Sequence, residues 1–280
     1  MRWREGSGSS NIEDRRGLGP IGGIGVGGVI LAIIGYALFG IEPEQTMSVL
    51  NTITGEQQEG QVGTPGDEGG QFVSQILGST EQVWTAEFQA SGLQYEPTRT
   101  VLYTTGTLTG CGVGQAAMGP FYCPQDRKVY LDLGFFNELE QNFGAPGDFA
   151  RAYVIAHEVG HHVQLLTGVS EDVARRMQAA GSQEEANSWS IRQELQADCY
   201  AGFWAKKAND SRRWMDPGDL EAGLRAASAV GDDTIQRRTQ GQVVPDAFTH
   251  GTAEQRVRWF TRGYESGDSD ACDTFSSQTL

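Results

Sequence analysis

The chain of 280 residues is short of basic side chains, of histidine and of cysteine. It contains 21 Lys and Arg against 36 Asp and Glu, a formal net charge of −15, and only four histidines and four cysteines. The scarcity of positive charge argues against nucleic acid as a partner, because binding to the phosphate backbone requires a basic surface. Hydrophobic residues make up 38% of the chain, enough for a packed core, so a wholly disordered protein is excluded.

Long apolar runs are also scarce, and residues 21–41 form one uncharged run of membrane-spanning length. About 20 apolar residues in a helix cross a hydrocarbon core of about 30 Å. A cleaved signal peptide is the alternative, but its apolar region is shorter and would be followed by small residues instead of Glu42-Pro43-Glu44. Four arginines precede the run, so we expect a single-pass cell-membrane protein with residues 1–20 in the cytoplasm and the bulk extracytoplasmic.

Glycine is frequent in this run, and Gly23 and Gly27 match the GxxxG pattern that lets two membrane helices approach closely. In a run so rich in glycine the match is close to what chance gives, and weak self-association is the less favoured interpretation. Residues 42–70 are rich in Gly, Gln and Glu without helical or strand periodicity, which predicts a flexible acidic linker. The folded body is therefore expected over residues 71–280, as one domain.

The body shows both helical and strand periodicity, which predicts an α+β fold with a small sheet. The expected helices cover 71–88 (two pieces, broken near Gly78), 149–166, 184–207 and 253–265, and the expected strands cover 100–105 and 128–133. Thr252 and Gln255 form a capping-box pattern at the start of the last helix.

Two of the four histidines lie in the sequence His157-Glu158-Val159-Gly160-His161, an HExxH motif. Residues four apart share one face of a helix, so both imidazoles can reach one metal ion while Glu158 lies beside it. With so few histidines, the expected number of chance matches in the chain is roughly 0.004. The motif therefore predicts a catalytic zinc site, against the alternative of a core helix with hydrogen-bonded histidines.

The residues that follow the motif narrow the type of site. His162 points about 100° away from His161 around the helix, so we expect it to be a supporting or purely structural residue. A metzincin would continue with Gly at position 164 and His at position 167, but the chain has Gln164 and Thr167. The metzincin arrangement of three histidines is therefore excluded.

A glutamate on a later helix can supply the third ligand, as in thermolysin-like enzymes. Glu194 is the best candidate, because Asp198 lies one helical turn further on and can accept the free ring N–H of a liganding histidine. A solvated pair of acids is the alternative for these two residues. Glu184 and Glu185 are also within reach as ligands.

Four segments together resemble the neutral zinc metallopeptidases of the YpfJ type. They are HEVGHHVQ (157–164), ELQADCYAG (194–202), MGPFYCPQD (118–126) and VYLDLGFF (129–136). The resemblance implies a zincin-like α+β domain that holds one zinc ion per chain. It also implies that the zinc ligands are His157, His161 and Glu194 and that the catalytic acid and base is Glu158.

The segment HGTAEQR (250–256) is similar to the His and Arg that follow the ligand helix in membrane-associated gluzincins. His250 is a candidate catalytic residue that could stabilise an oxyanion or occupy the fourth zinc position at rest; a structural role is the alternative. Arg256 could pair with Asp198 or remain a solvated charge. By analogy with other zincins, the strand over 128–133 is expected to form the edge along which an extended peptide aligns.

The four cysteines include no C-x2-C pair of the kind that holds a structural zinc ion. An even number of cysteines beyond a membrane anchor indicates disulfides. Of the three possible connectivities we favour Cys111–Cys123 together with Cys199–Cys272, the second of which would tie the expected ligand helix to the C-terminal tail. In a cytoplasmic body, free buried thiols would be expected instead.

These features favour a membrane-anchored zinc metallopeptidase that hydrolyses peptide bonds in a peptide or protein substrate. Zinc lowers the pKa of its bound water toward about 7 and polarises the scissile carbonyl, while Glu158 takes the water proton and passes it to the leaving amine. A zincin-fold binding or assembly protein that holds zinc without turnover is one alternative, and a structural zinc module is another. The glutamate at 158 argues against the binding protein, because a scaffold needs no base there.

Overall fold

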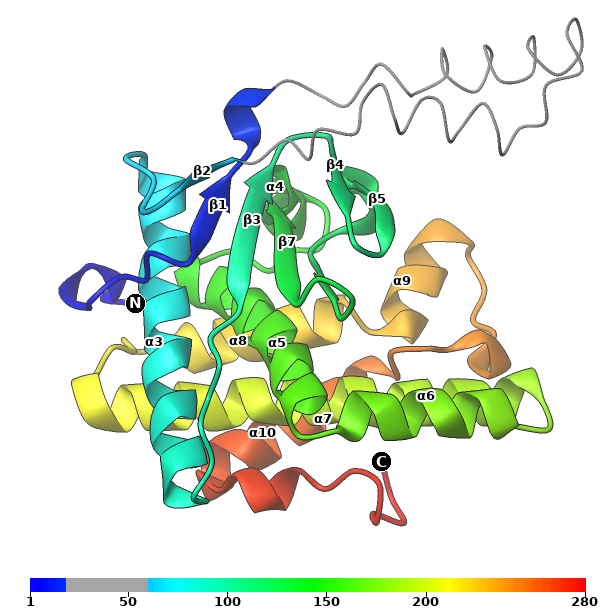
Figure 1. Cartoon of the computed structure of the whole chain (residues 1–280). Helices are drawn as coiled ribbons and strands as arrows, with labels where there is room; N and C mark the ends of the chain where they lie inside the picture. Colours follow the sequence, from blue (N-terminus) through cyan, green and yellow to red (C-terminus); the bar gives the residue numbers. More distant parts are fainter. Residues whose placement is uncertain (19–59) are drawn as a thin grey trace, which may run out of the picture.

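The computed structural model describes residues 1–18 and 60–280, which form one mixed sheet with helices packed against it (Figure 1). The sheet has the strand order β2-β1-β3-β7-β6. Its strands are β1 (Ile12–Asp14), β2 (Gln61–Val62), β3 (Arg99–Tyr103), β6 (Phe121–Cys123) and β7 (Lys128–Asp132). Strand β3 pairs in parallel with β1 and β7, whereas the outer strands β2 and β6 run antiparallel to their neighbours. A separate hairpin joins β4 (Gly106–Thr109) to β5 (Gly112–Gln115).

Helices make up most of the rest of the described chain. They are α3 (Glu68–Ala90), α4 (Gly134–Gln141), α5 (Asp148–Leu166), α6 (Val169–Ala179), α7 (Gln183–Arg212), α8 (Asp219–Ala229), α9 (Asp232–Thr239) and α10 (Ala253–Ser266). Three of the helices expected from the sequence are confirmed as α5, α7 and α10. The capping box is confirmed too, because Thr252 and Gln255 exchange both of its hydrogen bonds. The mixed α+β class is therefore correct.

The helix that carries the HExxH motif lies at the centre of the protein. In Figure 1, α5 lies between the strands above it and α7 below it, and α10 lies on the far side of α7. The core around these helices contains the indole rings of Trp84, Trp204 and Trp259, each at most 2% exposed. Such a central position fixes the backbone of α5 on all sides, which is what a metal site built on it requires.

Small residues allow these helices to approach closely. A side chain at Gly160 would bring its Cβ to 3.2 Å from the Cα of Ala197, so α5 and α7 cross at the glycine of the HExxH motif. A Cβ at Gly202 would clash with the carbonyl oxygen of Phe260, and Gly263 of α10 makes the matching approach to α7. This second crossing brings Arg256, near the N-terminus of α10, alongside Asp198 of α7.

The break expected near Gly78 is wrong, because α3 runs unbroken from Glu68 to Ala90. Gly78 has a different use. A Cβ at this position would clash with the backbone carbonyl of Ser7, so the glycine makes room for the N-terminal segment to cross the helix. The helix also starts earlier than expected, because the side chain of Asp67 caps it by accepting a hydrogen bond from the backbone N–H of Gly70.

The described N-terminal residues are part of the domain, whereas the sequence predicted a separate segment over 1–20 and a domain starting at 71. Strand β1 pairs in register with both β2 and β3, and Trp3 is 4% exposed and packs edge-on against Phe72 of α3. Residues 60–70, expected as linker, contain β2 and the start of α3. Sequence periodicity misses a strand of three residues.

The expected transmembrane helix over 21–41, with Gly23 and Gly27, lies outside the described residues, as does most of the expected linker over 42–70. Among the residues that the structure describes, no helix combines the length and the apolar character needed to cross a membrane.

The expectation that residues 128–133 form a sheet edge is also wrong. Strand β7 pairs with β3 on one side and with β6 on the other. The outer strand next to it is β6. It lies in the Gly- and Pro-rich stretch over 110–124, where the sequence pattern predicts no strand. Both expected disulfides are present, since Cys111 is bonded to Cys123 of β6 and Cys199 of α7 to Cys272.

Candidate metal centre

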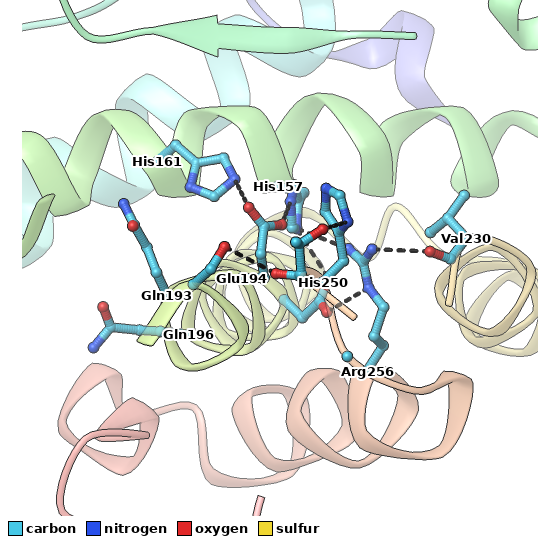
Figure 2. A network of polar contacts seen from close by, with 12 residues as sticks. His157, His161, Gln193, Glu194, Gln196, Val230, His250 and Arg256 are labelled. Atoms are coloured by element: carbon cyan, nitrogen blue, oxygen red, sulfur yellow. Dashed lines mark hydrogen bonds and ion pairs between the residues drawn. The ribbon is translucent and has the colours of Figure 1, made fainter. Parts of the chain in front are cut away.

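Three side chains from α5 and α7 converge on one point. The ligand atoms of His157, His161 and Glu194 all lie within 4.8 Å of one another, so one metal ion can contact all three. The Nε2 atom of His157 is 3.2 Å from one carboxylate oxygen of Glu194, and the Nε2 atom of His161 is 3.4 Å from the other. Figure 2 shows the two imidazoles on one helix facing the carboxylate on the other. Two imidazoles and one carboxylate are the donor set of a catalytic zinc site with one open position.

The second ring nitrogen of each histidine is already bonded within the protein. His157 Nδ1 donates to Asp198 Oδ1 at 2.9 Å, and His161 Nδ1 donates to Gln164 Oε1 at 2.9 Å. Both rings are thereby oriented with Nε2 toward Glu194, which is the usual arrangement behind metal-binding histidines. The residues present thus fit a zinc ion.

Asp198 is the centre of a buried network behind His157. Its carboxylate is fully buried and receives two hydrogen bonds from Arg256, Nε to Oδ2 at 2.8 Å and Nη2 to Oδ1 at 2.9 Å. It also accepts a hydrogen bond from the hydroxyl of Tyr153 at 2.5 Å. The expected contact between Arg256 and Asp198 is therefore confirmed, and the alternative of a solvated arginine is wrong.

Burial and charge oppose each other in this network. Burial alone would raise the pKa of Asp198, but Arg256 and His157 outweigh it and hold the pKa of this carboxyl below its ordinary value. Burial would lower the pKa of His157, yet Asp198 and Glu194 raise it to about 10. The pKa of Glu194 is held well below its ordinary value by the two histidines, against the effect of burial. Binding of a metal through Nε2 of His157 therefore requires this ring to lose a proton.

Glu158 lies beside the ligands but contacts none of them by a hydrogen bond. It is 8% exposed, and within the described part of the chain its carboxylate has no hydrogen-bond partner. Among the described residues, the buried polar atoms that lack a partner do not include the oxygens of Glu158, so this carboxylate is accessible to water or a ligand. The charge of Glu158 acts on the ring of His161, which places this carboxylate near the metal centre.

His250 reaches the centre from the loop before α10. Its Nδ1 is 3.2 Å from Asp232 Oδ1 and its ring is half exposed. The other oxygen of Asp232 accepts the backbone N–H groups of Thr249, His250 and Gly251, which fixes this loop. The hydrogen bond that His250 donates to Asp232 raises the pKa of the ring, and Glu194 is near enough to raise it further. Figure 2 shows His250 on the same side of Glu194 as Arg256.

His162 has the supporting role that its position on the helix suggested. Its Nε2 donates to the backbone carbonyl of Glu96 at 2.6 Å, and its Nδ1 accepts from the hydroxyl of Tyr122 at 2.9 Å. The side chain is 1% exposed and points away from the three candidate ligands. It ties α5 to the outer strand β6. The remaining alternative ligands, Glu184 and Glu185, do not belong to the cluster.

Sequence reasoning missed three residues of this centre, Tyr153, Gln164 and Asp232. Tyr153 lies four residues before His157, so helical spacing could have placed it on the same face. Asp232 had no such signal, because it acts across a loop on His250, 18 residues later in the chain.

Comparison with known proteins now adds the family. A family described as "Putative neutral zinc metallopeptidase" matches residues 1–275. The chain belongs to this family. "Uncharacterized protein YpfJ" of Escherichia coli K12 is 45% identical over 288 residues, covering 98% of this chain and 99% of that protein. "Uncharacterized protein Rv2575" of Mycobacterium tuberculosis H37Rv is 48% identical over 182 residues, covering 61% of this chain and 60% of that protein. No solved structure matches the chain.

Membership of the family confirms the resemblance found in the sequence and supports zinc as the metal of the centre. The match begins at residue 1, so the N-terminal segment that pairs in the sheet is part of what the family shares. The names of the two relatives give no activity.

Proposed function

We propose that this protein is a zinc-dependent peptidase with a zincin-like catalytic domain. One observation carries the proposal: the ligand atoms of two imidazoles and a carboxylate lie within 4.8 Å of one another, while the nearby carboxylate of Glu158 has no hydrogen-bond partner among the described residues. A zinc site with a purely structural role has four protein ligands and no use for such a carboxylate.

The zinc ligands in this proposal are His157 and His161 through Nε2 and Glu194 through its carboxylate, with one ion per chain. When bound, zinc supplies a Lewis acid that acidifies water and polarises a carbonyl. The protein holds the ligands in place through Asp198 behind His157 and Gln164 behind His161.

Glu158 is the general base and acid of the proposed reaction. Its carboxylate has no competing hydrogen bond among the described residues, so it can accept the proton of the attacking water and deliver it to the leaving amine. This double role requires a carboxylate that reaches both the water and the scissile nitrogen, which suits its place next to His157.

His250 has the geometry of a hydrogen-bond donor to the oxyanion. Asp232 accepts from Nδ1 and raises the pKa of the ring, which shifts the ring toward the form that also carries a proton on Nε2. A donor of this kind stabilises negative charge that develops on the carbonyl oxygen. A role as fourth zinc ligand at rest, through an unprotonated Nε2, is the alternative.

The substrate we propose is a peptide or protein segment bound in extended form along β6. Strand β6 is the outer strand on this side of the sheet, and an outer strand leaves backbone groups free to pair with another chain. It also contacts α5 directly through Tyr122 and His162, which fixes its distance from the metal centre.

We also propose that the domain works in an oxidising compartment at a membrane. Two disulfides are typical of proteins outside the cytoplasm, and the uncharged run over 21–41 is apolar enough to associate with lipid. Because β1 pairs with β3, residues 1–18 are proposed to lie on the same side as the domain. Fractionation, with protease protection of tags at both ends, tests this.

The reaction is tested by comparing the purified chain with its Glu158→Gln variant on a diverse peptide library. We expect zinc-dependent cleavage by the unaltered protein and a loss of at least about 100-fold in the variant, which should keep its zinc. Zinc bound without any cleavage would favour the alternative of a binding or assembly protein. Full activity in the variant would exclude the proposed role of Glu158.

A further inference from the structure

Two buried glutamines connect the back of the metal centre to the C-terminal tail. Gln164 of α5 is fully buried and Gln196 of α7 is 5% exposed. Gln164 Nε2 donates to Gln196 Oε1 at 3.0 Å, and Gln196 Nε2 donates to the backbone carbonyl of Cys272 at 3.2 Å. Gln164 Nε2 also donates to the backbone carbonyl of Gln193 at 2.7 Å. We call Gln164 and Gln196 the glutamine relay.

The direction of every hydrogen bond in the relay follows from the two backbone carbonyls that it contacts, those of Cys272 and Gln193. A backbone carbonyl can only accept, so the amide nitrogen of Gln196 must face Cys272 and that of Gln164 must face the carbonyl of Gln193. Each amide then presents its oxygen at the other end. The oxygen of Gln196 meets the nitrogen of Gln164, and the oxygen of Gln164 meets Nδ1 of His161.

This direction determines the state of the His161 ring. An amide oxygen offers only lone pairs, so Nδ1 must carry a proton to bond with it at 2.9 Å. In a neutral imidazole the lone pair is then on Nε2, the atom that faces Glu194. The relay thus selects the one tautomer in which His161 can bind a metal through Nε2.

We infer that Gln164 and Gln196 are positioning residues that fix the tautomer and the ring orientation of His161 from the carbonyl of Cys272. This inference rests on the proposed zinc site. The relay accepts the Nδ1 proton of His161 through a neutral amide, as Asp198 accepts that of His157 through a charged carboxylate. It also ends on a residue held by the disulfide to Cys199, which lies next to Asp198 on α7. The tail of the chain therefore supports the metal centre although it contributes no ligand.

The inference is tested by measuring zinc affinity in competition with a chelator for three variants of the full chain. Gln164→Met removes the acceptor of His161 and should weaken zinc binding about 10- to 100-fold. Gln196→Met touches neither a ligand nor zinc and should cause a smaller loss, because Gln164 keeps its bond to the carbonyl of Gln193. Gln193→Met is the matched control on α7, since its side chain bonds only to Ser170 among the described residues and its carbonyl remains.

A second readout follows the ring proton itself in zinc-loaded protein with ¹⁵N-labelled histidine. The Nδ1 proton of His161 should exchange slowly with solvent in the unaltered chain and in Gln193→Met, and faster in the two relay variants. A Gln164→Met chain with unchanged zinc affinity and a slowly exchanging proton would overturn the inference. Equal values for Gln196→Met and Gln193→Met would overturn the role of Gln196. Failure of the unaltered chain to bind zinc would instead overturn the proposed function.

Discussion

His157 and His161 lie one turn apart on α5 and face the carboxylate of Glu194. Their Nδ1 atoms, on the other side of each ring, have different hydrogen-bond partners. Behind His157 is a charged network, in which the buried Asp198 is bonded twice to Arg256. Behind His161 is the neutral glutamine relay. Figure 2 shows the two sides, with Gln193 and Gln196 toward His161 and Arg256 toward the opposite end.

The two histidines differ in their support because α10 contributes a cation, Arg256, to one side of α7, whereas the tail contributes a backbone carbonyl, that of Cys272, to the other. At Gly202 the two helices touch, and Arg256 reaches Asp198 to neutralise it. Near His161 no described cation is bonded to the relay, so a second buried carboxylate there would be uncompensated and costly. Neutral amides give the orientation without that cost. The two sides should therefore respond differently when a partner is removed.

The largest effect is expected from Arg256→Met. The change leaves Asp198 buried without its cation, which should lower the free energy of unfolding by about 3–5 kcal/mol. Urea denaturation measures this. Arg258→Met is the matched control on α10, because Arg258 is exposed and pairs with exposed Glu254, so its loss should cost at most about 1 kcal/mol. Equal midpoints for the two variants would contradict the charged network.

Removal of both cysteines of the Cys199–Cys272 disulfide comes next. Loss of a disulfide costs about 2–4 kcal/mol of stability. Because the Cys272 carbonyl anchors the relay, zinc affinity should fall as well. The control removes Cys111 and Cys123, whose disulfide joins the β4–β5 hairpin to β6, and should leave zinc affinity unchanged. Similar zinc affinities in the two double variants would show that the tail does not support the centre.

Asp198→Asn keeps the shape of the side chain and removes its charge. Zinc affinity should fall about 10- to 100-fold, since the carboxylate no longer holds the ring of His157. Combining it with Arg256→Met removes both charges, so the double variant should be more stable than the sum of the single losses predicts. Strict additivity, measured by urea denaturation, would mean that the two side chains do not act as a pair.

Tyr153→Phe should have the smallest effect. It removes one hydrogen bond to Asp198 but leaves both bonds from Arg256, so about 1 kcal/mol of stability should be lost. Zinc affinity should change less than in Asp198→Asn, as a chelator competition will show. A loss as large as that of Asp198→Asn would make the tyrosine a main support of the ring.

Local sequence patterns were sufficient for much of the centre. His157 and His161 are four residues apart, and so are Glu194 and Asp198, so helical geometry alone places each pair on one face. The pairing of Arg256 with Asp198 came from a resemblance, because the two residues are 58 positions apart.

Contacts between segments far apart in the sequence could not be predicted from such local patterns. Nothing in residues 12–14 shows that they insert between β2 and β3, because a three-residue strand has no periodicity to detect. Gly78 read as a helix break, whereas it accommodates the backbone of Ser7. The relay from Gln164 to Cys272 likewise depends on how the tail folds back, which only the three-dimensional structure reveals.

The central claim is that His157, His161 and Glu194 hold one zinc ion. Native mass spectrometry of the zinc-loaded chain and of its Glu194→Ala variant tests it most directly. We expect one zinc ion per chain in the unaltered protein and its loss from the variant at the same free zinc concentration, with both chains folded. Zinc retained at one ion per chain in Glu194→Ala would contradict the proposed centre and assign the third ligand elsewhere.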